Sequence, residues 1–170
     1  MKIAITGHTK GIGAVTVELL EAAGHEVVGF SRTNGYNVMR PKNIVKDAID
    51  CDVFINNAWQ PDAQPRLLYL MYEEWANKPK HIINISSTAG DYPDFFGMFG
   101  FNSWVPYVSD KQRLDAASYN LSRLWKPGMC KVTNVRPHWV RSAAIESFMA
   151  MLKKADLPLM EPIDVAEQVV

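Results

Sequence analysis

A glycine-rich stretch near the N-terminus carries the clearest chemical signal in this sequence. It reads TGHTKGIG over residues 6–13, between an apolar strand candidate and a helical pattern. Gly7 lets the chain turn at the strand end, Gly11 leaves room for a pyrophosphate, and Gly13 allows the helix to pack closely on the sheet. The helix N-terminus then offers free N–H groups and a positive dipole end to an anion. We therefore predict a nucleotide phosphate site, against the alternative of an ordinary turn that happens to carry glycines.

Three polar motifs follow this turn in order along the chain. NNA (56–58) ends one expected strand, SS (86–87) ends the next, and Tyr107 opens a helix that carries Lys111 one turn later. Each motif alone is weak, because these residue types are common. Their joint placement is more informative, since open α/β sheets bind ligands at the carboxyl ends of their strands. The motifs and the glycine turn are therefore expected to form one site.

Strand and helix patterns alternate along the whole chain. Strands are expected at 2–5, 26–30, 52–56, 81–86 and 131–136. Helices are expected at 14–23, 41–49, 66–77, 108–125, 143–154 and from Pro162 onward. This alternation predicts a Rossmann-type, doubly wound parallel sheet in a three-layer α/β/α fold. Only residues 36–39 are available for a third strand, which should therefore be rudimentary.

Composition limits the classes of partner. The chain has 170 residues, of which 48% are hydrophobic, and this fits a single domain over residues 1–170. It has 18 basic and 18 acidic residues, and this zero net charge argues against a nucleic-acid or membrane-surface partner. Cys51 and Cys130 lack CxxC spacing, so neither a disulfide framework nor a metal site is expected. The sequence has no signal peptide and no membrane-spanning apolar run, which predicts a soluble, cytoplasmic protein.

Over nearly its whole length the chain resembles the classical short-chain dehydrogenase/reductase family, as a shortened member. The matching stretches are TGHTKGIG (6–13), NNA (56–58), IINISSTAG (82–90), YVSDKQRLDAA (107–117), VRPHWVRSA (135–143) and the terminal EPIDVAEQVV. The resemblance implies hydride transfer between a nicotinamide cofactor and a small carbonyl or alcohol substrate. It assigns Tyr107 as the acid/base, Lys111 as its helper and ribose ligand, and Ser87 as the group that polarises the carbonyl.

The resemblance also implies a set of cofactor-binding residues. Besides Tyr107 and Lys111 these are Gly7, Thr9, Lys10, Gly11, Ile12, Gly13, Ser31, Arg32, Thr33, Asn37, Val38, Asn57, Ala58, Pro137, Val140 and Ser142. An acidic residue after the second strand would bind the ribose 2′-hydroxyl, whereas Ser31-Arg32-Thr33 offers a cation and hydroxyls that suit a 2′-phosphate. Because Lys10 adds a second cation, we expect NADP(H) in preference to NAD(H). The alternative is that Arg32 is a solvent-facing loop charge.

The chemistry of the three catalytic candidates agrees with these roles. A tyrosine has an ordinary pKa of ~10, and bringing it to neutrality takes roughly 4 kcal/mol. Lys111 lies one helical turn beyond Tyr107 on the same face, where its positive charge favours the phenolate. The Ser87 hydroxyl can hydrogen-bond the substrate oxygen as hydride arrives at carbon. The alternative is a helix-start aromatic with a solvated lysine.

Several features depart from the family pattern. Trp59 and His138 stand where the family usually has glycines, close to the nicotinamide end. The asparagine that commonly completes the catalytic tetrad has no obvious counterpart. The aromatic segment 91–106 is interpreted as a substrate lid or pocket wall, or as an oligomer contact. No seventh strand is expected, and the apolar helices at 66–77 and 108–125 favour a homodimer or higher homo-oligomer.

Three interpretations follow. The leading one is a small NADP-dependent carbonyl reductase or alcohol dehydrogenase of unspecified substrate. Its main rival is a cofactor sensor or scaffold protein that keeps the dinucleotide site without catalysis. The catalytic candidates favour the enzyme, whereas Trp59, His138 and the shortened chain favour the rival. A sugar-nucleotide epimerase or dehydratase is weaker, because the glycine spacing differs and a substrate domain is missing.

Overall fold

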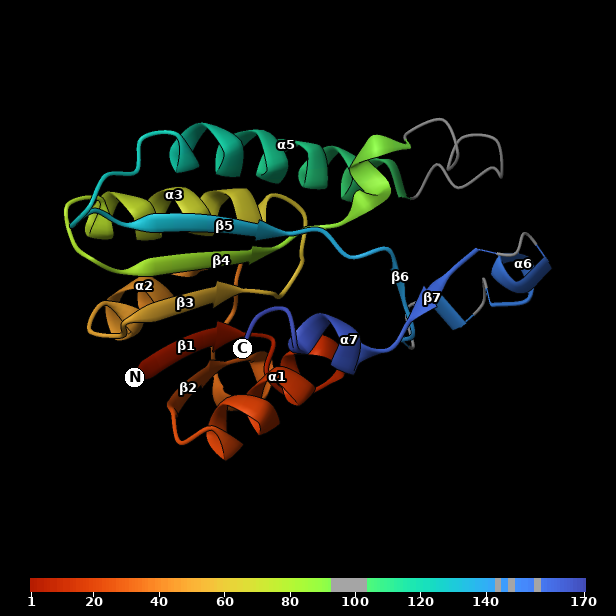
Figure 1. Cartoon of the computed structure of the whole chain (residues 1–170), viewed down its shortest axis with the longest axis horizontal. Coiled ribbons are helices and arrows are strands. Elements are labelled where there is room, and N and C mark those ends of the chain that lie inside the picture. Colours follow the sequence, from red (N-terminus) through yellow and green to blue (C-terminus); the bar gives the residue numbers. More distant parts are fainter. Residues whose placement is uncertain (93–103, 143–144, 147–148, 155–156) are drawn as a thin grey trace.

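A five-stranded parallel sheet forms the centre of the computed structural model, which describes residues 1–92, 104–142, 145–146, 149–154 and 157–170 (Figure 1). The strands lie in the order β2-β1-β3-β4-β5, and every neighbouring pair is parallel. Their bounds are β1 (Lys2–Thr6), β2 (Glu26–Phe30), β3 (Val53–Asn56), β4 (His81–Ile85) and β5 (Lys131–Val135). The direction of winding reverses between β1 and β3, so the sheet is doubly wound with its switch point there.

Helices cover both faces of this sheet. The helices of the described residues are α1 (Gly11–Ala22), α2 (Pro41–Ala48), α3 (Ala63–Trp75), α5 (Val105–Ser122), α6 (Met149–Lys154) and α7 (Pro162–Ala166), with short 3₁₀ turns η1 (Arg32–Asn34) and η2 (Thr88–Asp91). Of these, α6 lies beyond the carboxyl edge of the sheet (Figure 1). Helices α1 and α7 pack together on one face, and α2, α3 and α5 lie on the other (Figure 1). The predicted three-layer α/β/α fold is confirmed.

The strands supply both layers of the core because successive side chains point to opposite faces of a sheet. On β3, Phe54 joins the cluster that faces α2, α3 and α5, whereas Ile55 joins the cluster that faces α1 and α7. Trp75 on α3 is fully buried in the first cluster, and its indole N–H donates to the carbonyl of Ile49 at 3.1 Å. The sheet thus lies between two hydrophobic layers, and the polar residues of the predicted site lie at its carboxyl edge.

The short third strand expected at 36–39 is not formed. Gly35 adopts a left-handed conformation with φ +88°, which turns the chain away from the sheet after η1. The Asn37 side chain accepts a hydrogen bond from the backbone N–H of Met39, and the Arg40 N–H donates to the Asn37 carbonyl. These local bonds compete with strand pairing, and Pro41 then starts α2. Strand β2 is therefore an edge of the sheet.

Two short strands lie beyond the carboxyl edge of the sheet. Strand β6 (Trp139–Val140) pairs in parallel with β7 (Leu159–Met160), apart from the five-stranded sheet (Figure 1). Of the helix expected at 143–154, the structure forms α6 over Met149–Lys154, and residues 143–144 and 147–148 lie outside the described residues. Of the aromatic segment 91–106, residues 93–103 also lie outside them.

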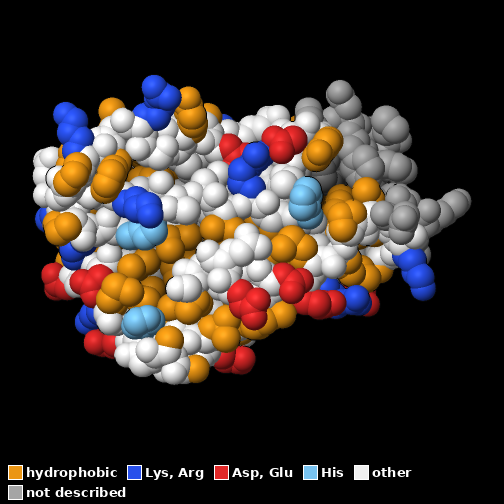
Figure 2. All heavy atoms as spheres, viewed as in Figure 1, with side chains coloured by type: hydrophobic (Ala, Val, Ile, Leu, Met, Phe, Trp, Pro, Cys, Tyr) orange, Lys and Arg blue, Asp and Glu red, His pale blue; other side chains and the backbone are white. Residues whose placement is uncertain are grey.

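Side chains of both charge signs are mixed over the face drawn in Figure 2, with hydrophobic groups between them. This agrees with the balance of 18 basic and 18 acidic residues. In the described part of the chain, no helix combines the length and the apolar character that crossing a membrane needs.

Candidate active site

A cavity of about 820 Å³ opens where the carboxyl ends of the strands meet. It brings together nine of the residues predicted from the sequence: Lys10, Ile12, Asn57, Ser87, Tyr107, Lys111, Pro137, Val140 and Ser142. Its lining also includes Trp59, Trp104, His138 and Trp139. Ten other predicted cofactor residues are not part of this lining: Gly7, Thr9, Gly11, Gly13, Ser31, Arg32, Thr33, Asn37, Val38 and Ala58.

The glycine turn has the backbone that a phosphate cradle needs. Gly7 and Gly11 adopt positive φ angles of +73° and +57°, which disfavour residues with a side chain. A Cβ atom at Gly13 would lie 2.2 Å from the carbonyl oxygen of Gly7, so only glycine lets α1 begin this close to the end of β1. At Gly11 an added Cβ atom would meet nothing within 4 Å, which leaves open space above the turn. Within the described residues, no side chain caps α1, so its first N–H groups remain available to an anion.

Asn57 ties the glycine turn to the end of β3. Its side-chain amide donates to the carbonyl of Thr6 at 2.9 Å, and the Thr6 hydroxyl accepts the backbone N–H groups of Asn57 and Ala58 at 3.0 Å. These bonds join the end of β1 to the end of β3 at the switch point. Asn57 and Ala58 therefore support the glycine turn by holding the backbone and side chain of Thr6, which precedes it.

The loop after β2 is held in one conformation by its own side chains. The hydroxyls of Ser31 and Thr33 are 2.6 Å apart, and the Asn34 amide donates to the carbonyl of Gly29 at 2.8 Å. Arg32 and Thr33 are exposed. Asn37 is exposed and takes part in the turn described above, whereas Val38 packs against the hydrophobic core.

His8 fills the space next to β2. A Cβ atom at Gly29 would lie 2.4 Å from the His8 ring, so the ring occupies the volume of a side chain at that position. Sequence reasoning gave a role to neither residue. A glycine inside an apolar strand is the signal that could have found this close approach.

Ser87 and Tyr107 meet in the cavity. Ser87 caps η2, where its Oγ accepts the backbone N–H of Ala89 at 3.1 Å. Burial raises the pKa of Tyr107, a hydrogen bond with Ser87 lowers it, and the charge of Asp115 raises it further. The net direction is upward. The phenol is thus less acidic than the sequence argument expects.

Lys111 is buried directly behind Tyr107. Its Nζ lies 5.3 Å from the centre of the Tyr107 ring and donates to Gln64 Oε1 at 2.7 Å and to the Ile85 carbonyl at 2.8 Å. Burial lowers the pKa of Lys111 to about 7, while Asp115 and Asp110 act in the opposite direction. The alternative of a solvated lysine is therefore wrong, because its surroundings strip water from the ammonium.

No protein-family model matches the sequence, and no curated protein matches it at a significant level. Solved structures match nearly all of it. The 3-alpha-hydroxysteroid dehydrogenase of a Pseudomonas species, complexed with NADH, has a TM-score of 0.78 at 18% identity, covering 99% of this chain and 87% of that one. An oxidoreductase of the short chain dehydrogenase/reductase family from Burkholderia thailandensis has a TM-score of 0.72 at 19% identity, covering 98% and 83%. A short chain dehydrogenase from Burkholderia cenocepacia, in complex with NADP, has a TM-score of 0.74 at 16% identity, covering 98% of this chain and 87% of that one.

The chain has the short-chain dehydrogenase/reductase fold. The sequence resemblance is thereby confirmed at the level of architecture. At identities of 16% to 19%, this similarity concerns the fold alone.

Trp59 forms a wall of the cavity and does not plug it. Its ring meets Tyr107 edge to face, with centroids 5.2 Å apart, and Trp104 meets Tyr107 in the same way at 5.4 Å. The Trp59 indole N–H donates to Asp110 Oδ2 at 3.1 Å, which draws the ring toward α5. The other departure from the family pattern, His138, lies with its Nδ1 3.1 Å from the Thr88 hydroxyl.

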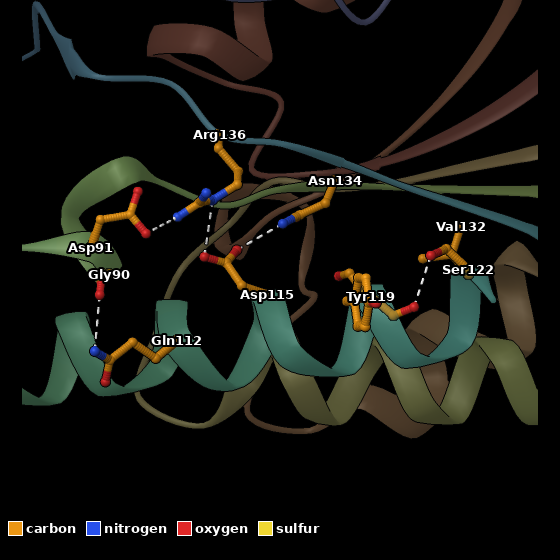
Figure 3. Close-up of a pocket in the computed structure, with 10 residues that line it drawn as sticks. Gly90, Asp91, Gln112, Asp115, Tyr119, Ser122, Val132, Asn134 and Arg136 are labelled. Atoms are coloured by element: carbon orange, nitrogen blue, oxygen red, sulfur yellow. Dashed lines mark hydrogen bonds and ion pairs between the residues drawn. The ribbon is translucent and has the colours of Figure 1, made fainter.

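Arg136 joins the elements that carry the catalytic candidates. It lines a second, open cavity of about 500 Å³ between β5 and α5. There it pairs with Asp91 of η2 at 2.5 Å and with Asp115 of α5 at 3.0 Å, and Figure 3 shows how these side chains lie. Asp115 also accepts a hydrogen bond from Asn134 at 2.7 Å. Since Ser87 caps η2 and Tyr107 lies on α5, these ion pairs help to fix the distance between the two hydroxyls.

Gln64 and Asp110 are two polar residues of this region that sequence reasoning missed. Both are buried, at 1% and 5% exposure. Gln64 precedes the expected start of its helix at residue 66, so no helical face was assigned to it. A polar residue at a helix start usually faces water, and composition alone gives no signal that these two do not.

Proposed function

We propose that the protein is an NADP(H)-dependent oxidoreductase that transfers hydride between a nicotinamide cofactor and a carbonyl or alcohol substrate. The observation that carries the proposal is the convergence of Ser87, Tyr107 and Lys111 on one cavity beside the glycine turn. The fold adds support, because similar structures were solved with NADH and with NADP. We further propose that residues 1–170 form a single dinucleotide-binding domain.

The glycine turn and the N-terminus of α1 would hold the cofactor diphosphate, because both supply N–H groups without side chains in the way. Arg32 and Lys10 are exposed cations and would bind the 2′-phosphate together with the hydroxyls of Ser31 and Thr33. These four residues favour NADP(H) over NAD(H). The bound nicotinamide supplies the hydride that the protein itself lacks.

Tyr107 is the proposed acid/base. In carbonyl reduction its phenol gives a proton to the substrate oxygen as hydride reaches the carbon, and in alcohol oxidation the phenolate takes the proton back. Ser87 Oγ accepts a bond from Ala89, which leaves its O–H hydrogen to donate to the substrate oxygen or to the phenol. The charged form of Lys111 stabilises the phenolate across 5.3 Å.

The lining of the cavity limits the substrate. Tyr92, Trp104 and Trp139 contribute aromatic side chains to this lining, and Ile145 and Leu157 contribute aliphatic ones. Among the described residues, no Asp or Glu lines this cavity. We therefore propose an apolar carbonyl compound or alcohol without a positive charge.

The test combines cofactor binding with turnover. Purified protein is titrated with NADPH and NADH by tryptophan fluorescence, and apolar aldehydes and ketones are then reduced by the wild type and by Tyr107→Phe. We expect tighter binding of NADPH and a loss of at least about 100-fold in kcat for Tyr107→Phe. Tyr119→Phe, an exposed tyrosine on the same helix, is the matched control and should keep full activity.

The second candidate function is a cofactor sensor without catalysis. It is favoured by the effect of burial, which raises the pKa of Tyr107 and lowers that of Lys111. Tight NADPH binding without Tyr107-dependent turnover of any substrate in the panel would support the sensor and overturn the enzyme.

A further inference from the structure

The ammonium group of Lys111 is held by neutral acceptors. Its hydrogen-bond partners are Gln64 Oε1 at 2.7 Å and the Ile85 carbonyl at 2.8 Å, and Lys111 itself is only 3% exposed. A buried cation is usually stabilised by a carboxylate in direct contact. Here Gln64 occupies the position from which such a carboxylate would act.

The carboxylates of α5 are engaged elsewhere. Asp110 accepts bonds from Trp59 and from the backbone N–H of Asp62, and it also pairs with Arg113. Asp115 pairs with Arg136 and Asn134. The charges of these two aspartates act on the Lys111 ammonium, and the Tyr107 ring lies beside it. Neither aspartate replaces Gln64 as a contact of the ammonium.

The orientation of the Gln64 amide follows from its surroundings. Its Nε2 donates to the Asn56 carbonyl at 2.7 Å and to the Ile85 carbonyl at 3.0 Å, which uses both amide hydrogens. Rotating the amide by 180° would turn Oε1 toward two carbonyl oxygens and the NH₂ group toward an ammonium. Every contact therefore selects the orientation in which Oε1 accepts from Lys111.

A buried polar network extends this constraint across the sheet. Asn56 Nδ2 donates to the Gln64 carbonyl and to Asn84 Oδ1, both at 2.9 Å. Asn84 Nδ2 donates in turn to the Ser118 hydroxyl at 3.1 Å. The network links β3, β4, α3 and α5, so Gln64 is fixed on both its backbone and its side chain.

We propose that Gln64 is a positioning residue for the reaction, which fixes the ammonium of Lys111 behind Tyr107 with a neutral acceptor where a carboxylate would bind the proton more firmly. The inference rests on the proposed oxidoreductase function and names a residue through which that site is regulated by pH. Because burial lowers the pKa of Lys111 to about 7, the lysine changes its charge within the physiological range. A glutamate at position 64 would hold the proton and move this change to higher pH.

The first experiment measures the ionisation of Lys111 directly in the full-length protein. The Cε resonance of ¹³C-labelled Lys111, assigned by its loss in Lys111→Met, is followed from about pH 5 to about pH 10. We expect a midpoint near neutrality in the wild type and an upward shift of roughly one pH unit or more in Gln64→Glu. Gln60→Glu places the same new charge at an exposed position four residues earlier and should leave the midpoint unchanged. Equal midpoints in Gln64→Glu and the wild type would overturn the proposal.

The second experiment uses activity with NADPH and an apolar aldehyde. The pH profile of kcat should move upward in Gln64→Glu by the same amount as the resonance. In Gln64→Met, which has similar length without the acceptor, kcat should fall about 10-fold or more while the KM for the aldehyde changes little. If Gln64→Glu does not fold, an unchanged kcat in Gln64→Met still refutes the role. An inactive wild type would instead refute the proposed function, so the two failures are distinguishable.

Discussion

The indole N–H of Trp59 donates to Asp110 Oδ2 at 3.1 Å, and this contact joins the loop after β3 to the helix that carries Tyr107 and Lys111. The same carboxylate oxygen accepts the backbone N–H of Asp62 at 2.9 Å. Asp110 is 5% exposed, so this carboxylate has little access to water. The pair explains how a large residue stays at the edge of the cavity beside the phenol.

Removing this carboxylate should therefore loosen the wall of the site. We expect Asp110→Ala to lower the free energy of unfolding by about 1–3 kcal/mol, because two donors lose their acceptor. It should also reduce kcat, since Trp59 no longer packs reproducibly on Tyr107. Urea unfolding and turnover with NADPH measure the two effects. Asp50→Ala, at an exposed position, should change neither, and an unaffected Asp110→Ala variant would contradict the positioning argument.

Two glycine-to-alanine substitutions separate the effect of a steric clash from that of an unfavourable backbone conformation. Gly13→Ala places a Cβ atom 2.2 Å from the Gly7 carbonyl, so we expect the NADPH Kd to rise by at least about 10-fold, with a loss of stability. Gly24→Ala is the matched control, because Gly24 has φ +80° with nothing within 4 Å of an added Cβ. It should lose about 1 kcal/mol of stability and keep its affinity for NADPH. Fluorescence titration and thermal unfolding distinguish the outcomes.

The lowered pKa of Lys111 predicts a pH-dependent stability. The pKa of Lys111 in the folded protein, about 7, lies below its value in the unfolded chain. At low pH the buried positive charge therefore lowers the free energy of unfolding, and this free energy rises as the pH increases above about 7. Lys111→Met removes this charge. The stability of Lys111→Met relative to the wild type should therefore be highest near pH 6 and should fall by about 3 kcal/mol by about pH 9. A difference that is constant with pH would show that the lysine keeps its proton throughout.

Arg32 provides a test of cofactor preference. Replacing it with alanine should raise the Kd for NADPH by about 10- to 100-fold, because a charged hydrogen bond to the 2′-phosphate is lost, and should leave the Kd for NADH unchanged. Arg40→Ala, which removes another exposed cation before α2, is the control. Equal effects of Arg32→Ala on both cofactors would indicate that Arg32 does not contact the phosphate.

Much of the fold was predictable because it depends on local pattern. The apolar runs of β3 and β4 and the glycine spacing at 7, 11 and 13 report directly on buried strands and a strand-to-helix turn. The stretch 36–39 was not predictable as turn, because its outcome depends on a side-chain bond of Asn37. Helix α3 starts three residues earlier than its apolar pattern indicates, after Asp62 in a left-handed conformation.

The sequence predicted that the catalytic candidates lie together, but it did not predict the electrostatics of the cavity that they line. Tyr107 and Lys111 fall into the cavity as their helical spacing requires. Their pKa directions depend on desolvation, which is a property of the packed structure and has no signature in the spacing. Gln64 was missed for the same reason, since only the fold reveals that a glutamine at a helix start faces an ammonium.

The contact between the His8 ring and Gly29 restricts which residues these two positions can hold. Because one ring fills the volume next to a bare backbone, positions 8 and 29 cannot vary independently while the chain keeps this path. A bulkier residue in the strand has to be accompanied by a smaller one in the turn. Among close homologues, the two positions should therefore exchange size as a correlated pair.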